Sequence, residues 1–156
     1  MRRIVVLGAG FAGLIAAAGA VRKLAELAIL KDQVSVTVVN RDAWHAIRVR
    51  NYEADLAGLR VPLDDVLGPI GVEVVVGEVT GLDHNRREVY CAAAGRSVAL
   101  PYDRLVFALG SELVRPPIPG LAEHGFDIDT YDAAARLAAH LAALPQRPDA
   151  PSRFTA

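Results

Sequence analysis

The residues with the clearest chemical potential are the six that run Gly8-Ala9-Gly10-Phe11-Ala12-Gly13 near the N-terminus. In this spacing the first glycine permits a sharp turn out of a strand, because it adopts dihedral angles that a side chain forbids. The second leaves room for a pyrophosphate to approach the backbone, and the third lets a helix pack closely on the strand. Free N–H groups at the start of that helix attract phosphate, by about 0.3–1 kcal/mol for each favourable charge contact. The motif therefore predicts a dinucleotide site that includes Gly8, Gly10, Phe11, Ala12 and Gly13.

The elements around this motif determine whether it predicts a dinucleotide site, because the six-residue pattern alone arises by chance in glycine-rich chains. Residues 4–7 are a continuous apolar run typical of a buried strand. Residues 11–30 are rich in alanine and predict a helix, and the largely β-branched residues 34–39 predict a second strand. This strand-turn-helix-strand order is the context in which the motif binds a dinucleotide. The alternative is that the glycines serve only the close packing of a helix on a sheet.

The second predicted strand ends in Asn40, where dinucleotide-binding proteins usually carry an acidic residue that accepts hydrogen bonds from the adenosine ribose. An amide still accepts one such bond, worth about 1 kcal/mol where a carboxylate gives about 1.5–3 kcal/mol. We expect this replacement to weaken binding without abolishing it. Arg41 has three interpretations: it lies along the adenosine, it recognises the 2′-phosphate of NADP, or it is a solvated loop residue.

The rest of the chain alternates between strand-like and helix-like segments. Residues 44–59 are less regular, Pro62 predicts the start of a short helix towards Leu67, and Thr130 caps a helix that Pro145 ends. Strands are predicted over residues 72–76, 79–83, 87–92, 96–100 and 102–109. The pattern predicts an α/β fold with a parallel sheet and a small antiparallel β-meander.

Composition and charge narrow the class of protein. With 53% apolar and 22% charged residues over 156 positions, the chain is able to fold around a core. Its net charge of −1 gives no reason to expect a nucleic-acid or membrane-surface partner. The single cysteine, Cys91, excludes an intramolecular disulfide and fits a reducing, cytoplasmic setting. Residues 1–20 also resemble a secretory signal, but three glycines interrupt their apolar run, which is too short and glycine-rich to predict a transmembrane helix.

A second motif makes a family resemblance visible. It runs YDRLVFALGS from Tyr102 to Ser111 and is similar to the YDxLVIATG strand of the pyridine nucleotide-disulfide oxidoreductase superfamily. With the glycine turn and the VTVVN strand, it makes residues 1–144 resemble the N-terminal part of that superfamily's FAD-binding domain, in the type II NADH dehydrogenase-like branch. The resemblance implies a Rossmann-like FAD-binding domain. It also implies FAD as the cofactor and NAD(P)H as the electron donor.

The resemblance assigns roles to individual residues. In the family, backbone groups on the strand after the third parallel strand hold the adenine, and by position this is Val79. The second motif passes close to the flavin nucleotide at Ala108, Leu109 and Gly110. Leu109 replaces the threonine of the family's ATG triplet, which removes a hydroxyl but keeps small residues on both sides.

Two further expectations concern charged and titratable side chains. An arginine near the flavin pyrophosphate in related reductases matches Arg48 or Arg50, with Arg48 the better match, unless both form only surface ion pairs. His45 is expected to be a hydrogen-bonded loop residue and not a catalyst. The family's CxxxxC pair is absent, so a dithiol relay is excluded and Cys91 is expected to act as a small buried hydrophobe.

In the resembling family a second Rossmann unit binds NAD(P)H, and the chain then returns to supply the last strand of the FAD domain. We therefore expect residues 1–144 to form an incomplete domain without a catalytic residue, followed by a linker-like tail over residues 145–156. The exposed sheet edge would favour self-association. The first hypothesis is the FAD-binding part of an NAD(P)H-dependent flavoprotein oxidoreductase. The alternatives are a non-catalytic NAD(P)-binding module and a folded remnant that binds no nucleotide tightly.

Overall fold

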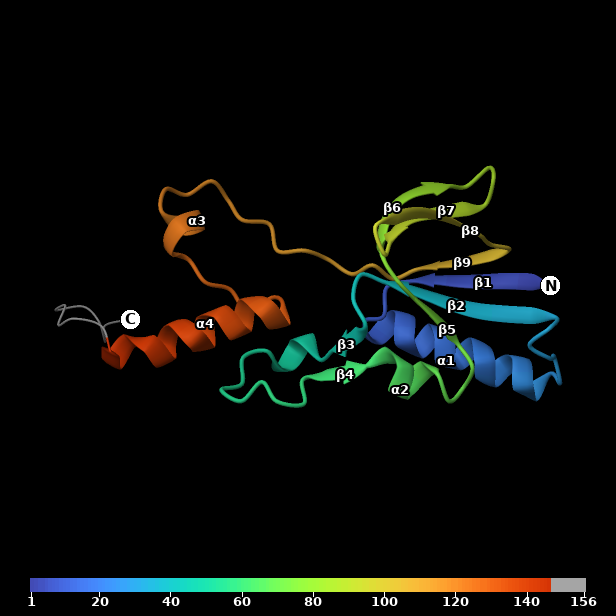
Figure 1. Cartoon of the computed structure of the whole chain (residues 1–156), viewed down its shortest axis with the longest axis horizontal. Coiled ribbons are helices and arrows are strands. Elements are labelled where there is room, and N and C mark those ends of the chain that lie inside the picture. Colours follow the sequence, from blue (N-terminus) through green and yellow to red (C-terminus); the bar gives the residue numbers. More distant parts are fainter. Residues whose placement is uncertain (147–156) are drawn as a thin grey trace. The chain divides into compact units, whose positions relative to one another are not determined.

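The computed structural model describes residues 1–146, which divide into two compact units. The first unit consists of Met1–His45 and Val61–Gly110, and the second of Ala46–Arg60 and the described residues from Ser111 onward. Figure 1 traces both along the sequence.

A four-stranded parallel sheet forms the centre of the first unit. Its order is β5 (Glu73–Val76), β2 (Val34–Asn40), β1 (Arg2–Leu7) and β9 (Arg104–Phe107), with every neighbouring pair parallel. The strands are mostly apolar in their interiors, which suits a sheet that is covered on both faces. The α/β fold and the parallel sheet predicted from the sequence are confirmed, although β9 is shorter than the predicted strand over residues 102–109.

Helix α1 (Phe11–Glu26) connects β1 to β2 and ends before the predicted residue 30. The reason is a left-handed residue, Ala28, whose φ is 54°. The N–H of Ile29 then donates to the carbonyl of Leu24 at 2.9 Å, which closes the last turn in the manner of a Schellman motif. Glycine is the usual residue at such a position, so the sequence carried no signal for this helix end.

Helices α1 and α2 (Leu63–Leu67) cover one face of the sheet (Figure 1). The core between them and the sheet is formed by small and branched apolar side chains: Val6, Ala9, Ala17, Val36, Val38, Leu63, Leu67 and Val72. Pro62 precedes α2 as its N-cap, which agrees with the predicted short helix.

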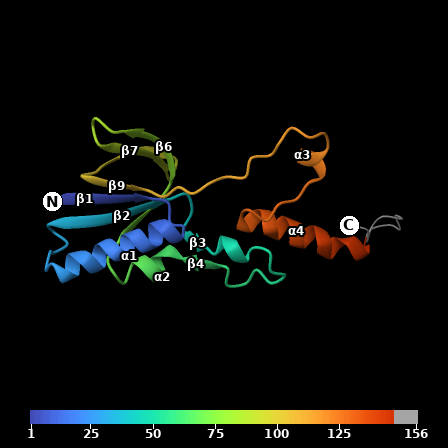
Figure 2. The ribbon, with the colours of Figure 1, turned by 180° about the vertical axis from the view of Figure 1, so that it is seen from behind.

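An antiparallel meander covers the opposite face of the sheet (Figure 2). It consists of β6 (Glu78–Asp83), β7 (Glu88–Ala93) and β8 (Arg96–Pro101), paired in that order as predicted. Its apolar side chains pack against those of the sheet in a second core made of Val5, Leu7, Val39, Val89 and Cys91. The first unit therefore has three layers: helices, parallel sheet and meander.

The second unit is mostly helix and loop. It contains a 3-10 turn η1 (Arg48–Arg50), the short helix α3 (Leu121–His124), helix α4 (Tyr131–Ala143) and a 3-10 turn η2 (Leu144–Gln146). As predicted, Thr130 caps α4: its hydroxyl accepts the N–H of Ala133 at 3.2 Å. Two short strands, β3 (Trp44–Ala46) and β4 (Arg60–Pro62), pair where the chain passes from one unit to the other and back. From residue 147 the predicted linker-like tail lies outside the described residues.

Two glycines in α1 give a matched test of this packing. A Cβ at Gly13 would overlap the carbonyl oxygen of Gly8, whereas a Cβ at Gly19 meets no atom within 4 Å in the described structure. We expect Gly13→Ala to lower the free energy of unfolding by about 3 kcal/mol or more. Gly19→Ala should raise it by about 0.5–1 kcal/mol, because alanine favours the helix. Urea unfolding measures both, and equal effects of the two substitutions would contradict the packing described here.

Cys91 provides a second test. It is buried in the core beneath the meander, and burial raises the pKa of its thiol. Because the thiolate is the reactive form, we expect iodoacetamide at pH 8 to label the native chain at least about tenfold more slowly than the urea-unfolded chain. Mass spectrometry of the labelled protein measures both rates, and equal rates would show that the meander does not cover this side chain.

Candidate functional site

The glycine turn lies at the carboxyl end of β1, immediately before α1. The N–H of Gly8 donates to the carbonyl of Val39 at 2.7 Å, which ties the start of the turn to β2. In the sheet, β2 lies on one side of β1 and β9 on the other. The carboxyl ends of the strands are the edge at which parallel α/β sheets bind ligands, and the glycine turn follows β1 at this edge.

The structure explains the glycines at positions 8, 10 and 13 in different ways. Gly8 has φ 91°, and a Cβ there would overlap the carbonyl oxygen of Ala108. Gly13 packs on the backbone of Gly8. Gly10 differs from both: its φ of −67° suits any residue, and no atom of the described structure lies within 4 Å of an added Cβ. The fold therefore requires glycine at positions 8 and 13, but leaves the space in front of Gly10 open.

The first turn of α1 faces this space, and no side chain of the described structure neutralises its partial positive charge or caps its N–H groups. Gly10 is the N-cap, and in the described structure no side chain caps the helix and no acidic residue lies in its first turn. The first N–H to bond back is that of Leu14, which donates to the carbonyl of Gly10 at 2.9 Å. The N–H groups before it, together with the positive end of the helix dipole, form an arrangement that suits a phosphate group.

Side chains from the last residue of β2 and from β3 hold the peptide groups of Ala9 in the turn. Asn40 Oδ1 accepts the N–H of Ala9 at 2.9 Å, and His45 Nδ1 lies 2.7 Å from the carbonyl oxygen of Ala9. Since a carbonyl only accepts, His45 Nδ1 carries the hydrogen. The His45 ring is buried and packs edge-on against Phe11 at 4.9 Å. The predicted hydrogen bonding of His45 is confirmed, although the residue lies in strand β3 and not in a loop.

The second motif lies directly beside the glycine turn. The N–H of Ala108 donates to the carbonyl of Leu7 at 2.9 Å, and its own carbonyl fills the space of the missing Gly8 side chain. Leu109 and Gly110 continue outward as exposed residues, Gly110 with φ 77°. The structure thus brings together two motifs that lie about a hundred residues apart in the sequence, as the resemblance implied.

The strand predicted to hold an adenine also reaches this end of the sheet. The N–H of Gly77, just before β6, donates to the carbonyl of Asn40 at 2.8 Å. Val79 follows in β6, where it pairs with Cys91 and packs against the core beneath the meander. Arg41 is exposed in the bend after β2. The predicted roles of Val79 and Arg41 stay predictions.

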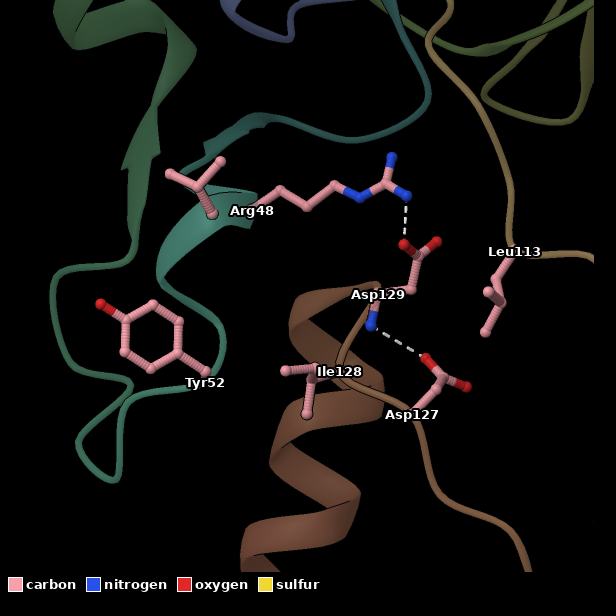
Figure 3. A pocket seen from close by; sticks show the side chains of 7 residues that line it. Arg48, Tyr52, Leu113, Asp127, Ile128 and Asp129 are labelled. Atoms are coloured by element: carbon pink, nitrogen blue, oxygen red, sulfur yellow. Dashed lines mark hydrogen bonds and ion pairs between the residues drawn. The ribbon is translucent and has the colours of Figure 1, made fainter.

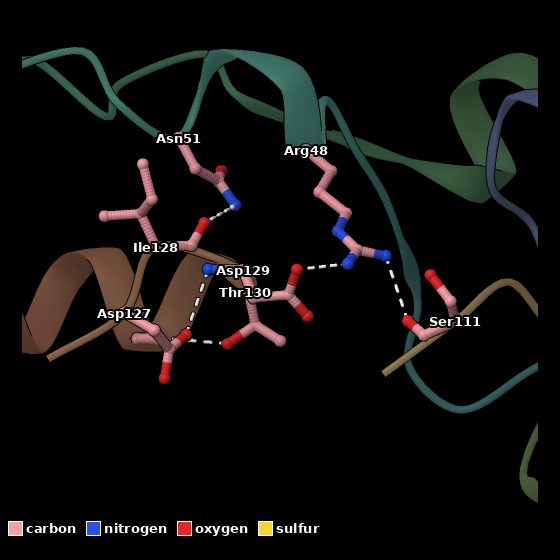
Figure 4. Close-up of polar contacts among 8 residues, drawn as sticks. Arg48, Asn51, Ser111, Asp127, Ile128, Asp129 and Thr130 are labelled. Carbon is pink, nitrogen blue, oxygen red and sulfur yellow. Dashed lines mark hydrogen bonds and ion pairs between the residues drawn. The ribbon is translucent and has the colours of Figure 1, made fainter. Parts of the chain in front are cut away.

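Arg48 belongs to the second unit and makes polar contacts within it (Figure 4). Its guanidinium forms an ion pair with Asp129 and donates to the carbonyl of Ser111 at 3.0 Å. Nearby, the buried Asn51 donates to the carbonyl of Ile128 at 3.1 Å. These contacts join η1 to the start of α4. The predicted contact of Arg48 with a pyrophosphate stays a prediction.

An open hollow of about 570 Å³ also lies in the second unit (Figure 3), lined by Arg48, Val49, Tyr52, Leu113, Asp127, Ile128 and Asp129. Both of its carboxylates have partners. The Asp129 N–H donates to Asp127 at 3.0 Å, and this bond, with the Arg115 guanidinium, lowers the pKa of Asp127. Across residues 1–146 no cluster of histidine, cysteine or acidic residues could hold a metal ion.

Sequence reasoning missed one side chain beside Asn40, that of Asp42. Its carboxylate accepts the N–H of Trp44 at 2.9 Å and lies 3.3 Å from the amide nitrogen of Asn40. The signal was present as an acidic residue two positions after Asn40, but nothing in the sequence showed which way the Asn40 amide would point.

The sequence of the chain is similar to those of known proteins. The chain is 56% identical over 148 residues to an NADH dehydrogenase-like protein of Mycobacterium tuberculosis, covering 95% of this chain and 36% of that protein. It is 29% identical over 145 residues to a type II NADH:quinone oxidoreductase of Staphylococcus haemolyticus, covering 90% of this chain and 34% of the other. The chain therefore spans about a third of the length of these relatives.

Solved structures show the same fold. The sulfide:quinone oxidoreductase of Aquifex aeolicus superposes with a TM-score of 0.75 at 23% identity, over 95% of this chain and 33% of that one. NDH2 of Plasmodium falciparum superposes with a TM-score of 0.76 at 16% identity, over 96% of this chain and 31% of that one.

Among the described helices, none is both long and apolar enough to cross a membrane.

Residues 2–147, nearly the whole chain, match the pyridine nucleotide-disulphide oxidoreductase family. The parallel sheet, the glycine turn and the meander are the parts that the family resemblance predicted. The chain belongs to the pyridine nucleotide-disulphide oxidoreductase family.

Proposed function

We propose that this chain forms the FAD-binding part of an NAD(P)H-dependent flavoprotein oxidoreductase of the NADH dehydrogenase-like type. The observation that carries the proposal is the open space at Gly10. Neither the backbone angles nor the packing of the described chain requires glycine there. A glycine that the fold does not need, at the N-terminus of an uncapped helix, is explained by a phosphate group that approaches the backbone.

In this proposal each part of the FAD has its own contacts. The free N–H groups of Phe11, Ala12 and Gly13 hold the pyrophosphate, with Arg48 as a further contact. Backbone groups at Val79 hold the adenine, and Asn40 and Arg41 lie on the side of the adenosine. Ala108, Leu109 and Gly110 lie beside the flavin nucleotide, where the small residues on either side of Leu109 permit close approach.

The reaction of the complete protein is part of the same proposal. FAD supplies hydride and electron transfer when it is bound, accepting from NAD(P)H and passing electrons to an acceptor such as a quinone. The residues of this chain bind and orient the cofactor through the turn that Asn40 and His45 hold in place. We assign no catalytic residue to this chain. Residues 1–144 are proposed as the FAD-binding domain.

The first test is flavin retention. We expect the purified chain to retain FAD after desalting and to quench its fluorescence. Gly10→Leu should weaken FAD binding at least about tenfold, because the new side chain fills the space of the pyrophosphate and forfeits its contacts with the helix N-terminus. Gly19→Leu is the matched control, since it places the same bulk in the same helix at a position that is also open in the described structure.

FAD binding to Gly10→Leu as tight as to the unchanged chain would refute the proposed site. Titration with NAD and NADP completes the experiment. A preference for NADP that Arg41→Ala abolishes would support a non-catalytic nucleotide-binding module instead. No thermal shift with any of the three nucleotides would indicate a folded remnant without a ligand.

A second test concerns Asn40, where an acidic residue is usual. Its Nδ2 donates to the carbonyl oxygens of Asp42 at 2.9 Å and Trp44 at 3.3 Å. In Asn40→Asp the new carboxylate would face these oxygens without a hydrogen to donate. We therefore expect the substitution to lower the free energy of unfolding by about 1–3 kcal/mol and to weaken FAD binding.

Urea unfolding and flavin titration measure both effects of Asn40→Asp. Asn85→Asp, in the exposed turn between β6 and β7, adds the same charge and serves as the control. If Asn40→Asp instead stabilised the chain and tightened binding, Asn40 would be a simple replacement for the acid and not part of the loop structure.

A further inference from the structure

The side chain at the usual acidic position is directed into the protein's own backbone. Asn40 Oδ1 accepts the Ala9 N–H, and both hydrogens of Nδ2 have oxygen partners in Asp42 and Trp44. An amide has two donors and two acceptor lone pairs, so a single lone pair on Oδ1 is left for a ligand. Asn40 therefore serves mainly to fix the glycine turn to the loop after β2.

The Asp42 carboxylate, by contrast, uses only one of its two oxygens in hydrogen bonds within residues 1–146. Its Oδ1 accepts the Trp44 N–H at 2.9 Å and lies 3.3 Å from Asn40 Nδ2, which fixes the orientation of the group. Within residues 1–146, Oδ2 accepts no hydrogen bond, and Asp42 is exposed. A carboxylate held by one oxygen is well placed to accept ligand hydroxyls with the other.

The position of this carboxylate suits the ribose of a bound dinucleotide. A continuous set of hydrogen bonds leads from the Ala9 N–H through Asn40 to Asp42, so one side chain separates the carboxylate from the glycine turn. In a Rossmann site the pyrophosphate lies at the start of the first helix, and the adenosine ribose lies at the end of the second strand. Asp42 follows β2 by two residues.

We propose that Asp42, and not Asn40, supplies the carboxylate that accepts the hydroxyls of the adenosine ribose, with Asn40 as a positioning residue that orients it. This inference rests on the proposed FAD site. It also gives the site a specificity, because a carboxylate that accepts a 2′-hydroxyl repels the 2′-phosphate of NADP. The site therefore binds FAD and excludes NADP.

The experiment measures dissociation constants for the unchanged chain and Asp42→Asn, with FAD and with the FAD analogue that lacks the adenosine 2′-hydroxyl. We expect Asp42→Asn to bind FAD about tenfold more weakly, since a charged hydrogen bond is lost. The unchanged chain should bind the 2′-deoxy analogue about tenfold more weakly than FAD. Asp42→Asn should not distinguish the two nucleotides. Asp32→Asn, at an exposed carboxylate before β2, is the matched control and should leave all the values unchanged.

The direction of the change separates the hydroxyl contact from simple charge repulsion. Removing a negative charge near a diphosphate tightens binding when no specific contact is lost, so tighter binding of FAD by Asp42→Asn would overturn the inference. Equal affinity, or an equal loss for both nucleotides, would overturn it as well. If the unchanged chain bound neither nucleotide, the proposed function itself would fail. If it bound FAD but Asp42→Asn bound FAD equally well, only the role of Asp42 would fail.

Discussion

The peptide groups of Ala9 are the point on which the rest of the site depends. Its N–H bonds to Asn40, the last residue of β2, and its carbonyl to His45 in β3. These two bonds fix the direction in which the glycine turn faces before any ligand is present. A backbone site of this kind has no side chains of its own to adjust, so its shape must be set by its neighbours. The turn and the loop after β2 therefore form one structural unit.

Most of the fold could be predicted from the sequence because local patterns agree with their final environment. The apolar strands β1 and β2 are covered on both faces, and Thr130 caps a helix. The glycine turn was predictable because two of its glycines are required by the packing of the chain itself. Such segments can be predicted because their local conformational preferences agree with their packing in the folded chain.

The parts that escaped prediction depend on a single conformation or on hydrogen bonds between distant segments. Helix α1 ends early because Ala28 adopts a left-handed conformation that usually requires glycine. The sequence did not indicate that the Asn40 amide also donates to the loop that follows it. Asp42 becomes relevant only because of this arrangement. Spacing in the sequence indicates which residues are near a turn, but not which of their atoms already form hydrogen bonds within the chain.

The interlock between Gly8 and Ala108 has a consequence for synthesis of the protein. β9 joins the sheet through parallel pairing with β1, and Asp103 also bonds both backbone groups of Arg3. These partners are separated by about a hundred residues, and contacts this distant in sequence form slowly. On the ribosome, β1, α1 and β2 emerge long before the strand that closes over the turn. Until β9 pairs with β1, the nascent chain has an unpaired strand edge at which other chains can add by hydrogen bonding.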